Sequence, residues 1–243
     1  MLKSLLQNKL LLDDTFLVGT ADLSGLIDRK YGDYKYGISI GKILDDTIID
    51  SIANGPTIEY YNYYQRVNNE LAAKAEEIKK ELHKINVYSI VLDPTVTTNS
   101  SEYKAYLNNL SVDISHKMVA TRAGLGWIGK TDLFISTQFG PRLRLVSILI
   151  NKNPGINSIP IDESRCGKCN VCVEKCPAQA ATGELWNINL HRDKFFDAFK
   201  CREMCGQLAK QRFNVDIRIC GICVSVCPIG KKNKKKSYTK GVL

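Results

Sequence analysis

Two cysteine runs in the last third of the chain constrain what it can fold into more than any other feature. The first reads C-G-K-C-N-V-C-V-E-K-C-P and the second reads C-G-I-C-V-S-V-C-P. The cysteines of the two runs are Cys166, Cys169, Cys172, Cys176, Cys220, Cys223 and Cys227. The first spacing is typical of a loop in which three thiolates hold one [4Fe–4S] cluster and the fourth reaches a second cluster. The runs therefore predict two [4Fe–4S] clusters and one-electron chemistry at low potential.

The crossed pattern of such loops also predicts which thiolates share a cluster. One cluster would be held by Cys166, Cys169, Cys172 and Cys227. The other would be held by Cys176, Cys220, Cys223 and one further thiolate, from Cys201 or Cys205. From the residues alone this last choice stays open. Each run ends at a proline, which removes a backbone donor and fixes φ.

Zinc and disulfides are the alternatives for these cysteines. The chain has nine cysteines, and the first falls at position 166. A disulfide framework is typical of short secreted chains, whereas this chain opens without a signal-peptide pattern. Structural zinc sites commonly use two C-x-x-C pairs, which fits the first run less well than a cluster does. We therefore expect a cytoplasmic protein whose thiolates bind iron–sulfur clusters.

The charge of the chain is concentrated at its end. The formal net charge is +9, and the segment Lys231–Leu243 holds six lysines and no acidic residue. Such a segment is expected to be disordered, and it could bind RNA phosphate or simply be solvated. No stretch of about 18 apolar residues is present, so no membrane partner is expected.

The sequence predicts three parts. Residues 1–150, which contain no cysteine, are expected to form a layered α/β domain. A ferredoxin-like domain is expected over 165–230, and the basic tail covers 231–243. Apolar runs predict strands at 16–20, 36–40, 87–92, 133–136 and 143–150. Apolar residues at helical spacing predict a helix over 67–85, and further helices are expected at 116–122 and 192–212. Residues 151–164 have the composition of a linker. Strands that alternate with helices favour a sheet with helices packed against it.

A glycine-rich segment, A-G-L-G-W-I-G-K at residues 123–130, is the second informative motif. Gly124, Gly126 and Gly129 allow a tight turn and close backbone approach. Trp127 adds a flat apolar face and Lys130 a charge, so the loop could cradle a phosphate or a flat cofactor. The segment matches neither the P-loop nor the dinucleotide-binding pattern. Arg142, with Arg144 two residues on, could bind a phosphate or the polar edge of a cofactor, or could be a solvated strand edge.

The chain resembles the epoxyqueuosine reductase family. The resemblance is carried by four features in the same order: the glycine-rich segment, the first cysteine run, a lone cysteine and the second cysteine run. The resemblance covers roughly Val112 to Ile229. It implies an α/β corrinoid-binding domain joined to a double-cluster domain, related in fold to reductive dehalogenases. It also implies a bound cobalamin, an external donor such as flavodoxin or ferredoxin, and Cys201 rather than Cys205 as the remaining ligand.

The chain departs from that family's pattern where the proton donor is expected. The family carries an acidic residue in V-D-[ST]-x-P, whereas this chain reads V-D-I-S-H-K from Val112. Asp113 or His116 could supply the proton, since imidazole is a competent acid near neutral pH. The alternative is a helix N-cap beside a surface histidine. The family also continues into a region that grips transfer RNA, beyond the point where this sequence ends.

The function predicted from these features is a cobalamin-dependent iron–sulfur oxidoreductase that removes oxygen or halogen from a substrate. A second reading is a ferredoxin-type electron-transfer protein. A third is a reductive activator of a partner enzyme that holds a corrinoid or a flavin. A flavin could also fill the α/β domain itself. A large cavity lined by the glycine-rich segment and Arg142 is expected only on the first reading.

Overall fold

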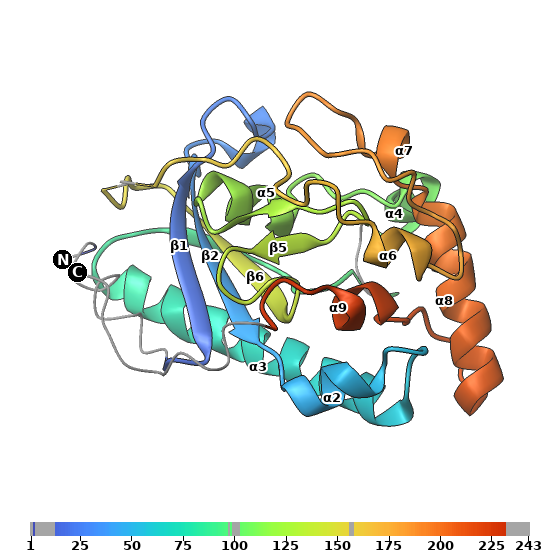
Figure 1. Cartoon of the computed structure of the whole chain (residues 1–243). Coiled ribbons are helices and arrows are strands. Elements are labelled where there is room, and N and C mark those ends of the chain that lie inside the picture. Colours follow the sequence, from blue (N-terminus) through green and yellow to red (C-terminus); the bar gives the residue numbers. More distant parts are fainter. Residues whose placement is uncertain (1, 3–12, 97, 99–102, 156–157, 232–243) are drawn as a thin grey trace.

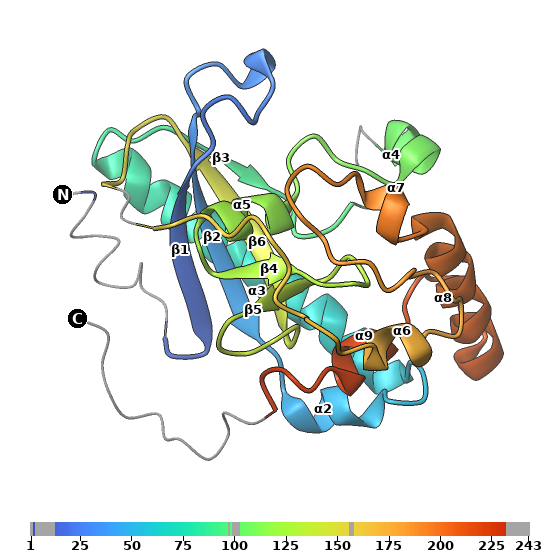
Figure 2. The same cartoon turned by 45° about the horizontal axis from the view of Figure 1, so that its top comes forward.

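The computed structural model describes residues 2, 13–96, 98, 103–155 and 158–231. Its centre is an antiparallel sheet in the order β1-β2-β6-β3. The strands are β1 (Phe16–Asp22), β2 (Tyr36–Ile43), β3 (Ser89–Leu92) and β6 (Leu143–Ile150). Figures 1 and 2 show the long helix α3 (Ile58–Lys84) on one side of the sheet and α5 (His116–Arg122) on the other. The predicted sheet exists, and it is antiparallel.

Both faces of the sheet are covered because the strands alternate two sets of side chains. On β6, Val146, Ile148 and Ile150 pack with the apolar face of α3. The opposite face, with Leu149, packs with Val119 of α5. Helix α5 comes so close that a Cβ added to Gly37 would lie 2.8 Å from the Val119 side chain. The result is a three-layered arrangement of helix, sheet and helix.

Strand β3 is half as long as β6 and leaves part of the sheet edge open. Its four residues pair only with Ser147–Ile150 of β6. Within the described residues, the first half of β6, from Leu143 to Val146, has no partner strand on that side. This uncovered half-strand borders the larger of the two cavities described below.

The glycine-rich segment forms the first strand of a two-stranded hairpin, β4 (Gly126–Ile128) with β5 (Phe134–Ser136). Gly124 has φ of +69°, and a Cβ there would collide with the backbone of Ile159. At Gly126 an added Cβ would lie far inside van der Waals contact with the Ile135 carbonyl oxygen. These two glycines are therefore needed by the chain's own packing.

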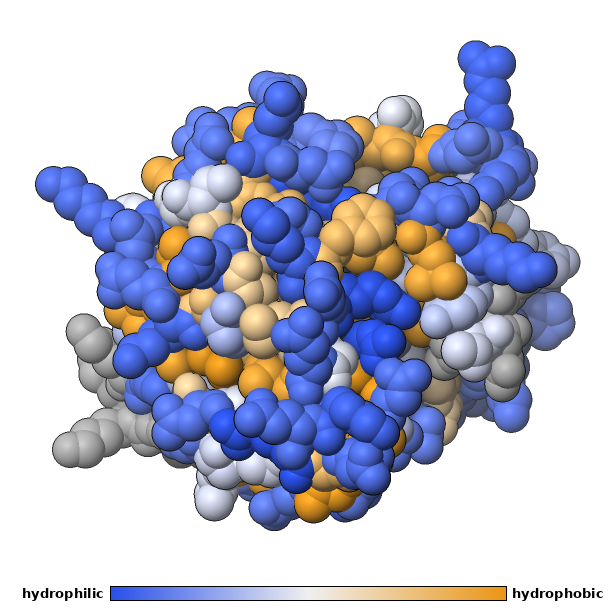
Figure 3. Space-filling view, turned by 90° about the vertical axis from the view of Figure 1, so that its right-hand side faces the viewer, coloured by the Kyte–Doolittle hydropathy of each residue, from blue (hydrophilic) through white to orange (hydrophobic). Residues whose placement is uncertain are grey.

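The cysteine-bearing part wraps around the open edge of the sheet. Its helices are α6 (Val171–Glu174), α7 (Arg192–Phe195), α8 (Ala198–Phe213) and α9 (Ile222–Val226). The remaining elements are α2 (Asp46–Ser51), α4 (Tyr103–Asn109) and the 3-10 turn η2 (Arg29–Tyr31). Helix α8 forms one side of the molecule in Figure 1, and that side is mostly hydrophilic, with hydrophobic residues interspersed (Figure 3).

The predicted element bounds hold best where the apolar pattern is strongest. The helix at 116–122 and the strand at 143–150 are found with the predicted limits. The helix predicted over 67–85 begins earlier, at Ile58, because Thr57 accepts a hydrogen bond from the Tyr60 amide and caps it. The helix predicted over 192–212 is broken into α7 and α8, since Asp197 caps a new start. The predicted tail lies outside the described residues, apart from Lys231.

No helix among the described residues is long and apolar enough to cross a membrane.

Replacing Gly126 by alanine should destabilise the protein strongly, because the added methyl group would meet backbone that cannot swing away. We expect a loss of about 3 kcal/mol in the free energy of unfolding, at the upper end for overpacking. Gly41→Ala is the matched control, since its nearest contacts would be side chains at 3.4 Å or more. Chemical denaturation of both variants makes the test, and equal losses would contradict the assignment.

Candidate functional site

Five cysteines from both runs border a small cavity of about 160 Å³. Four of them, Cys166, Cys169, Cys172 and Cys227, are the set predicted for one cluster, and the fifth is Cys223. The hairpin supplies the opposite wall through Gly129, Lys130, Thr131 and Ile135. Helices α6 and α9, which lie within the two runs, contact one another, and this contact brings Cys227 close to the first run.

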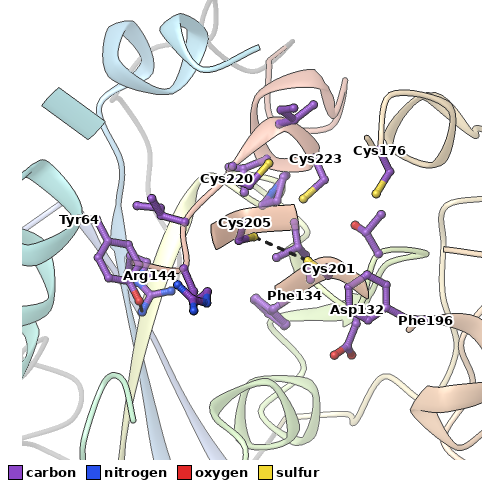
Figure 4. Close-up of a pocket in the computed structure, with 18 of the residues that line it drawn as sticks. Tyr64, Asp132, Phe134, Arg144, Cys176, Phe196, Cys201, Cys205, Cys220 and Cys223 are labelled. Atoms are coloured by element: carbon purple, nitrogen blue, oxygen red, sulfur yellow. Dashed lines mark hydrogen bonds between the residues drawn. The ribbon is translucent and has the colours of Figure 1, made fainter. Parts of the chain in front are cut away.

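The remaining cysteines border a larger cavity of about 450 Å³. They are Cys176, Cys201, Cys205, Cys220 and Cys223. Figure 4 shows them gathered on one side of this cavity, with Tyr64 and Arg144 on the other. Cys223 borders both cavities, so the two sites adjoin.

The donor set suits clusters better than single ions. Among the described residues, no three His, Cys, Asp or Glu side chains converge as the ligands of one metal ion would. A zinc ion requires its sulfurs at about 2.3 Å. Here the thiols instead border cavities, and thiolates around a cavity are the donor set that [4Fe–4S] clusters require. The residues present therefore fit two clusters.

Two thiols compete for one position at the larger cavity. Cys201 and Cys205 lie one turn apart on α8, with their Sγ atoms 4.0 Å apart. Hydrogen bonds with Cys201 and Cys220, together with burial, raise the pKa of Cys205. The hydrogen bond with Cys205 lowers the pKa of Cys201 despite burial. Both thiols border the cavity, so Cys201 as the ligand stays a prediction from the family resemblance.

The wall opposite the cysteines is built on the sheet and α3. Because Arg144 lies on the same face of β6 as Val146 and Ile148, which pack with α3, its guanidinium reaches Asn68 at 3.0 Å and the Tyr64 hydroxyl at 3.1 Å. Its Cζ atom also lies 4.3 Å from the centroid of the Tyr64 ring. Burial raises the pKa of Tyr64, but Arg144 and nearby hydrogen bonds outweigh it, so the pKa lies below its ordinary value.

The sequence does not distinguish Arg144 from Arg142, because residues two apart on a strand share a face. Tyr60 and Tyr64, one helical turn apart on α3, also border the cavity. No pattern in the sequence marked Thr131 or Asn170, whose roles depend on the fold.

The two predicted acids occupy different places. His116 borders the larger cavity, where its Nε2 lies 2.8 Å from the Asp93 carbonyl oxygen and its Nδ1 lies 3.0 Å from the Ser147 hydroxyl. A carbonyl only accepts, so the ring donates through Nε2 and accepts through Nδ1. Burial lowers the pKa of His116 to about 4. Asp113 is half exposed, pairs with Lys30 and does not border the cavity.

The larger cavity is not lined by the residues that were expected to line it. Gly124, Gly126, Trp127 and Arg142 border neither cavity, while Gly129 and Lys130 border the smaller one. The Arg142 side chain is 3% exposed and is paired with Asp46 and Asp50 of α2. The charge of Arg142 is thus paired inside the fold, and its contact with a cofactor stays a prediction.

The larger cavity matches a flat organic cofactor in character. Its wall combines Tyr60, Tyr64, Phe134 and Phe196 with the guanidinium of Arg144. Its volume lies within the usual range for ligand pockets, roughly 300–1,000 Å³. The predicted second cluster would take part of that space.

Two thiol-lined sites beside a sheet domain define the class of protein: an iron–sulfur protein with paired clusters. A family profile described as "4Fe-4S double cluster binding domain" matches residues 165–230. The chain therefore carries a double-cluster domain.

The particular family is indicated by sequence similarity. The epoxyqueuosine reductase of Cyclobacterium marinum is 25% identical over 195 residues, which is 73% of this chain and 60% of that protein. The chain thus spans less than two thirds of the curated relative's length. The resemblance to epoxyqueuosine reductases that the motifs predicted is confirmed.

Solved structures share the fold. An epoxyqueuosine reductase solved with an epoxyqueuosine-modified tRNA stem loop superposes with a TM-score of 0.59 at 18% identity, over 95% of this chain and 65% of that one. A reductive dehalogenase described with a mechanism for B12-dependent dehalogenation gives 0.60 at 15% identity, over 87% and 29%. The mixed α and β fold of both kinds of enzyme is therefore also the fold of this chain.

The buried ring of His116 should make stability depend on pH. Its pKa is depressed from 6.5 to about 4 in the folded state, so the unfolded state binds the proton first as pH falls. Stability is fully present above about pH 6.5 and is lost toward pH 4, by at most about 1.4 kcal/mol per pH unit. Unfolding midpoints at pH 8 and pH 5 should differ less in His116→Gln than in the wild type. His191→Gln, at an exposed ring, should leave the difference unchanged.

Proposed function

We propose that this chain is an iron–sulfur oxidoreductase that passes low-potential electrons through two [4Fe–4S] clusters to a bound corrinoid. The substrate would lose oxygen or halogen, as in the relatives. One observation carries the proposal: a single cavity is bordered both by cysteines of the predicted second cluster and by aromatic residues and Arg144 of the sheet domain. A bare electron-transfer protein, the second reading, has no use for such a cavity.

The chain's own residues would hold the groups and keep water out. Thiolates of Cys166, Cys169, Cys172 and Cys227 would bind the first cluster. Those of Cys176, Cys201, Cys220 and Cys223 would bind the second. Bound clusters supply one-electron steps, and a bound corrinoid supplies a cobalt centre for the reduction. Cys223 borders both cavities, which supports a short path between the clusters.

Arg144 is the residue best suited to hold the polar edge of a cofactor. Its Nε and Nη2 are used by Asn68, Tyr64 and the Pro94 carbonyl. Within the described part of the chain, its Nη1 has no such partner. A guanidinium has five donors, so hydrogens remain available to a carboxamide or phosphate oxygen.

Reductive removal of oxygen or halogen also consumes protons. Asp113 and His116 remain the proposed sources, and they differ in position. His116 borders the cavity, but its low pKa leaves it neutral at pH 7, with its one N–H directed at Asp93. Asp113 would need to leave Lys30 to reach the cavity. An RNA substrate, an external flavodoxin or ferredoxin, and a cytoplasmic location are proposed from the resemblance alone.

The choice between Cys201 and Cys205 can be tested by cluster content. We expect Cys201→Ser to lose one cluster, and so about half of the bound iron and sulfide, because the second site loses its fourth thiolate. Cys205→Ser is the matched control and should keep both clusters. Iron and acid-labile sulfide analysis and EPR of the reduced protein make the measurement. The opposite pattern would assign the ligand to Cys205.

Corrinoid binding is tested by anaerobic titration with cob(II)alamin, followed by EPR and visible spectra. We expect a stoichiometric shift to the base-off signal. Arg144→Met should weaken binding about tenfold, the effect of roughly one charge-assisted hydrogen bond. Arg66→Met, on the same helix as Tyr64 but away from the cavity, should bind as the wild type does. An unperturbed cobalt signal with both clusters intact would leave electron transfer, or a flavin site, as the function.

A further inference from the structure

The indole of Trp127 is aimed at the first cysteine site. Its ring is 5% exposed, and its Nε1–H donates to the Sγ of Cys166 at 3.4 Å. An indole nitrogen can only donate, and it satisfies this requirement here with a sulfur. Cys166 is the first residue of the set that surrounds the smaller cavity. Trp127 of the glycine-rich segment therefore forms a hydrogen bond with a cysteine of the first run.

Lys130 lies three residues further on and is also directed into the protein. It is 4% exposed, borders the smaller cavity, and donates to Asn170 Oδ1 at 2.6 Å. Asn170 lies between Cys169 and Cys172 in the first run. No carboxylate is paired with Lys130 among the residues that the structure describes. A buried ammonium without a counter-charge is costly, so an anionic group is expected beside it.

Two neighbours complete this side of the cavity. Thr131 is 6% exposed and borders the same cavity as Cys172. At Gly129, an added Cβ would lie 3.6 Å from Cys166 Sγ and 2.9 Å from the Ile135 side chain. The absence of a side chain lets the hairpin approach the sulfur. The turn between β4 and β5 thus brings an N–H donor, a hydroxyl and a positive charge to one thiol-lined site.

We infer that the segment Trp127–Thr131 sets the reduction potential of the cluster bound by Cys166, Cys169, Cys172 and Cys227. This inference rests on the proposed iron–sulfur function and adds a role for the glycine-rich segment. Reduction adds one electron to a cluster that already carries negative charge with its four thiolates. Hydrogen bonds to the sulfurs and a nearby cation stabilise the reduced form more than the oxidised form. The potential of this cluster is therefore higher than it would be without these contacts.

A raised potential at the smaller cavity makes this cluster easier for an external donor to reduce. The wall of the larger cavity also holds cationic side chains, namely Arg144, Arg218 and Lys117, of which Lys117 is paired with Asp132. The inference therefore concerns the cluster at the smaller cavity alone and does not rank the two potentials.

The test is an anaerobic redox titration of the reconstituted protein, followed by EPR, without corrinoid or substrate. In Trp127→Phe, which keeps the ring but removes the N–H, one of the two reduction steps should fall to lower potential. A tenfold shift of that equilibrium is expected, which is about 59 mV for one electron. Lys130→Met should lower the same step, and the other step should hold in both variants.

Trp186→Phe is the matched control, because Trp186 is 8% exposed in the same apolar cluster and its indole donates to no cysteine in the described chain. It should leave both steps unchanged. Iron and sulfide content shows that each variant keeps both clusters. If either variant fails to fold, the other still tests the inference. Unchanged potentials with both clusters present would overturn it. A shift of the same size in Trp186→Phe would also overturn it, by reducing the effect to packing. Neither result depends on corrinoid binding. A failure of the proposed corrinoid function would appear in the cob(II)alamin titration, and a failure of this inference would appear in the redox titration.

Discussion

The short length of β3 is the constraint on which the rest of the structure depends. A strand that pairs with only the second half of β6 leaves Leu143, Arg144 and Leu145 at an edge without a partner strand in the described chain. Exposed edges of sheets must be covered, paired or charged. Here the cysteine-bearing part of the chain lies opposite this edge, and the larger cavity lies between the two. Arg142, at the start of the same strand, fixes α2 by ion pairs and reaches the Ser225 carbonyl of α9 at 3.2 Å. One strand thus carries both the cavity wall and the attachment of the cluster domain.

Sequence reasoning recovered the elements whose periodicity is strong, while the grouping of the cysteines stays a prediction. The strand at 143–150 is mostly apolar, and α5 follows a clear cap at Ser115. The strand pairing could not be predicted in the same way, because register and direction depend on contacts far apart in the chain. For the same reason Arg142 and Arg144, two positions apart, were exchangeable in the sequence. Their positions do not show that α2 supplies two carboxylates to Arg142 and that α3 supplies Asn68 and Tyr64 to Arg144.

The glycine-rich segment illustrates a different limit. Its composition correctly indicated tight packing against backbone, but composition does not say whose backbone is approached. Gly124 and Gly126 are required by Ile159 and Ile135 of the same chain. Trp127 and Lys130 turn toward the first cysteine run and away from the larger cavity. A sequence motif that is typical of a family can therefore have a role other than contact with that family's cofactor.

The position of Cys223 on the boundary of both cavities has a consequence for how the protein matures. One wall of the larger cavity is made of thiols that would also be ligands, so that wall acquires its final shape only when iron is inserted. Ligand binding and folding are then a single free-energy change, as in other metal-dependent domains. If the proposed clusters and corrinoid both bind, the clusters would therefore be inserted before the organic cofactor finds a complete pocket.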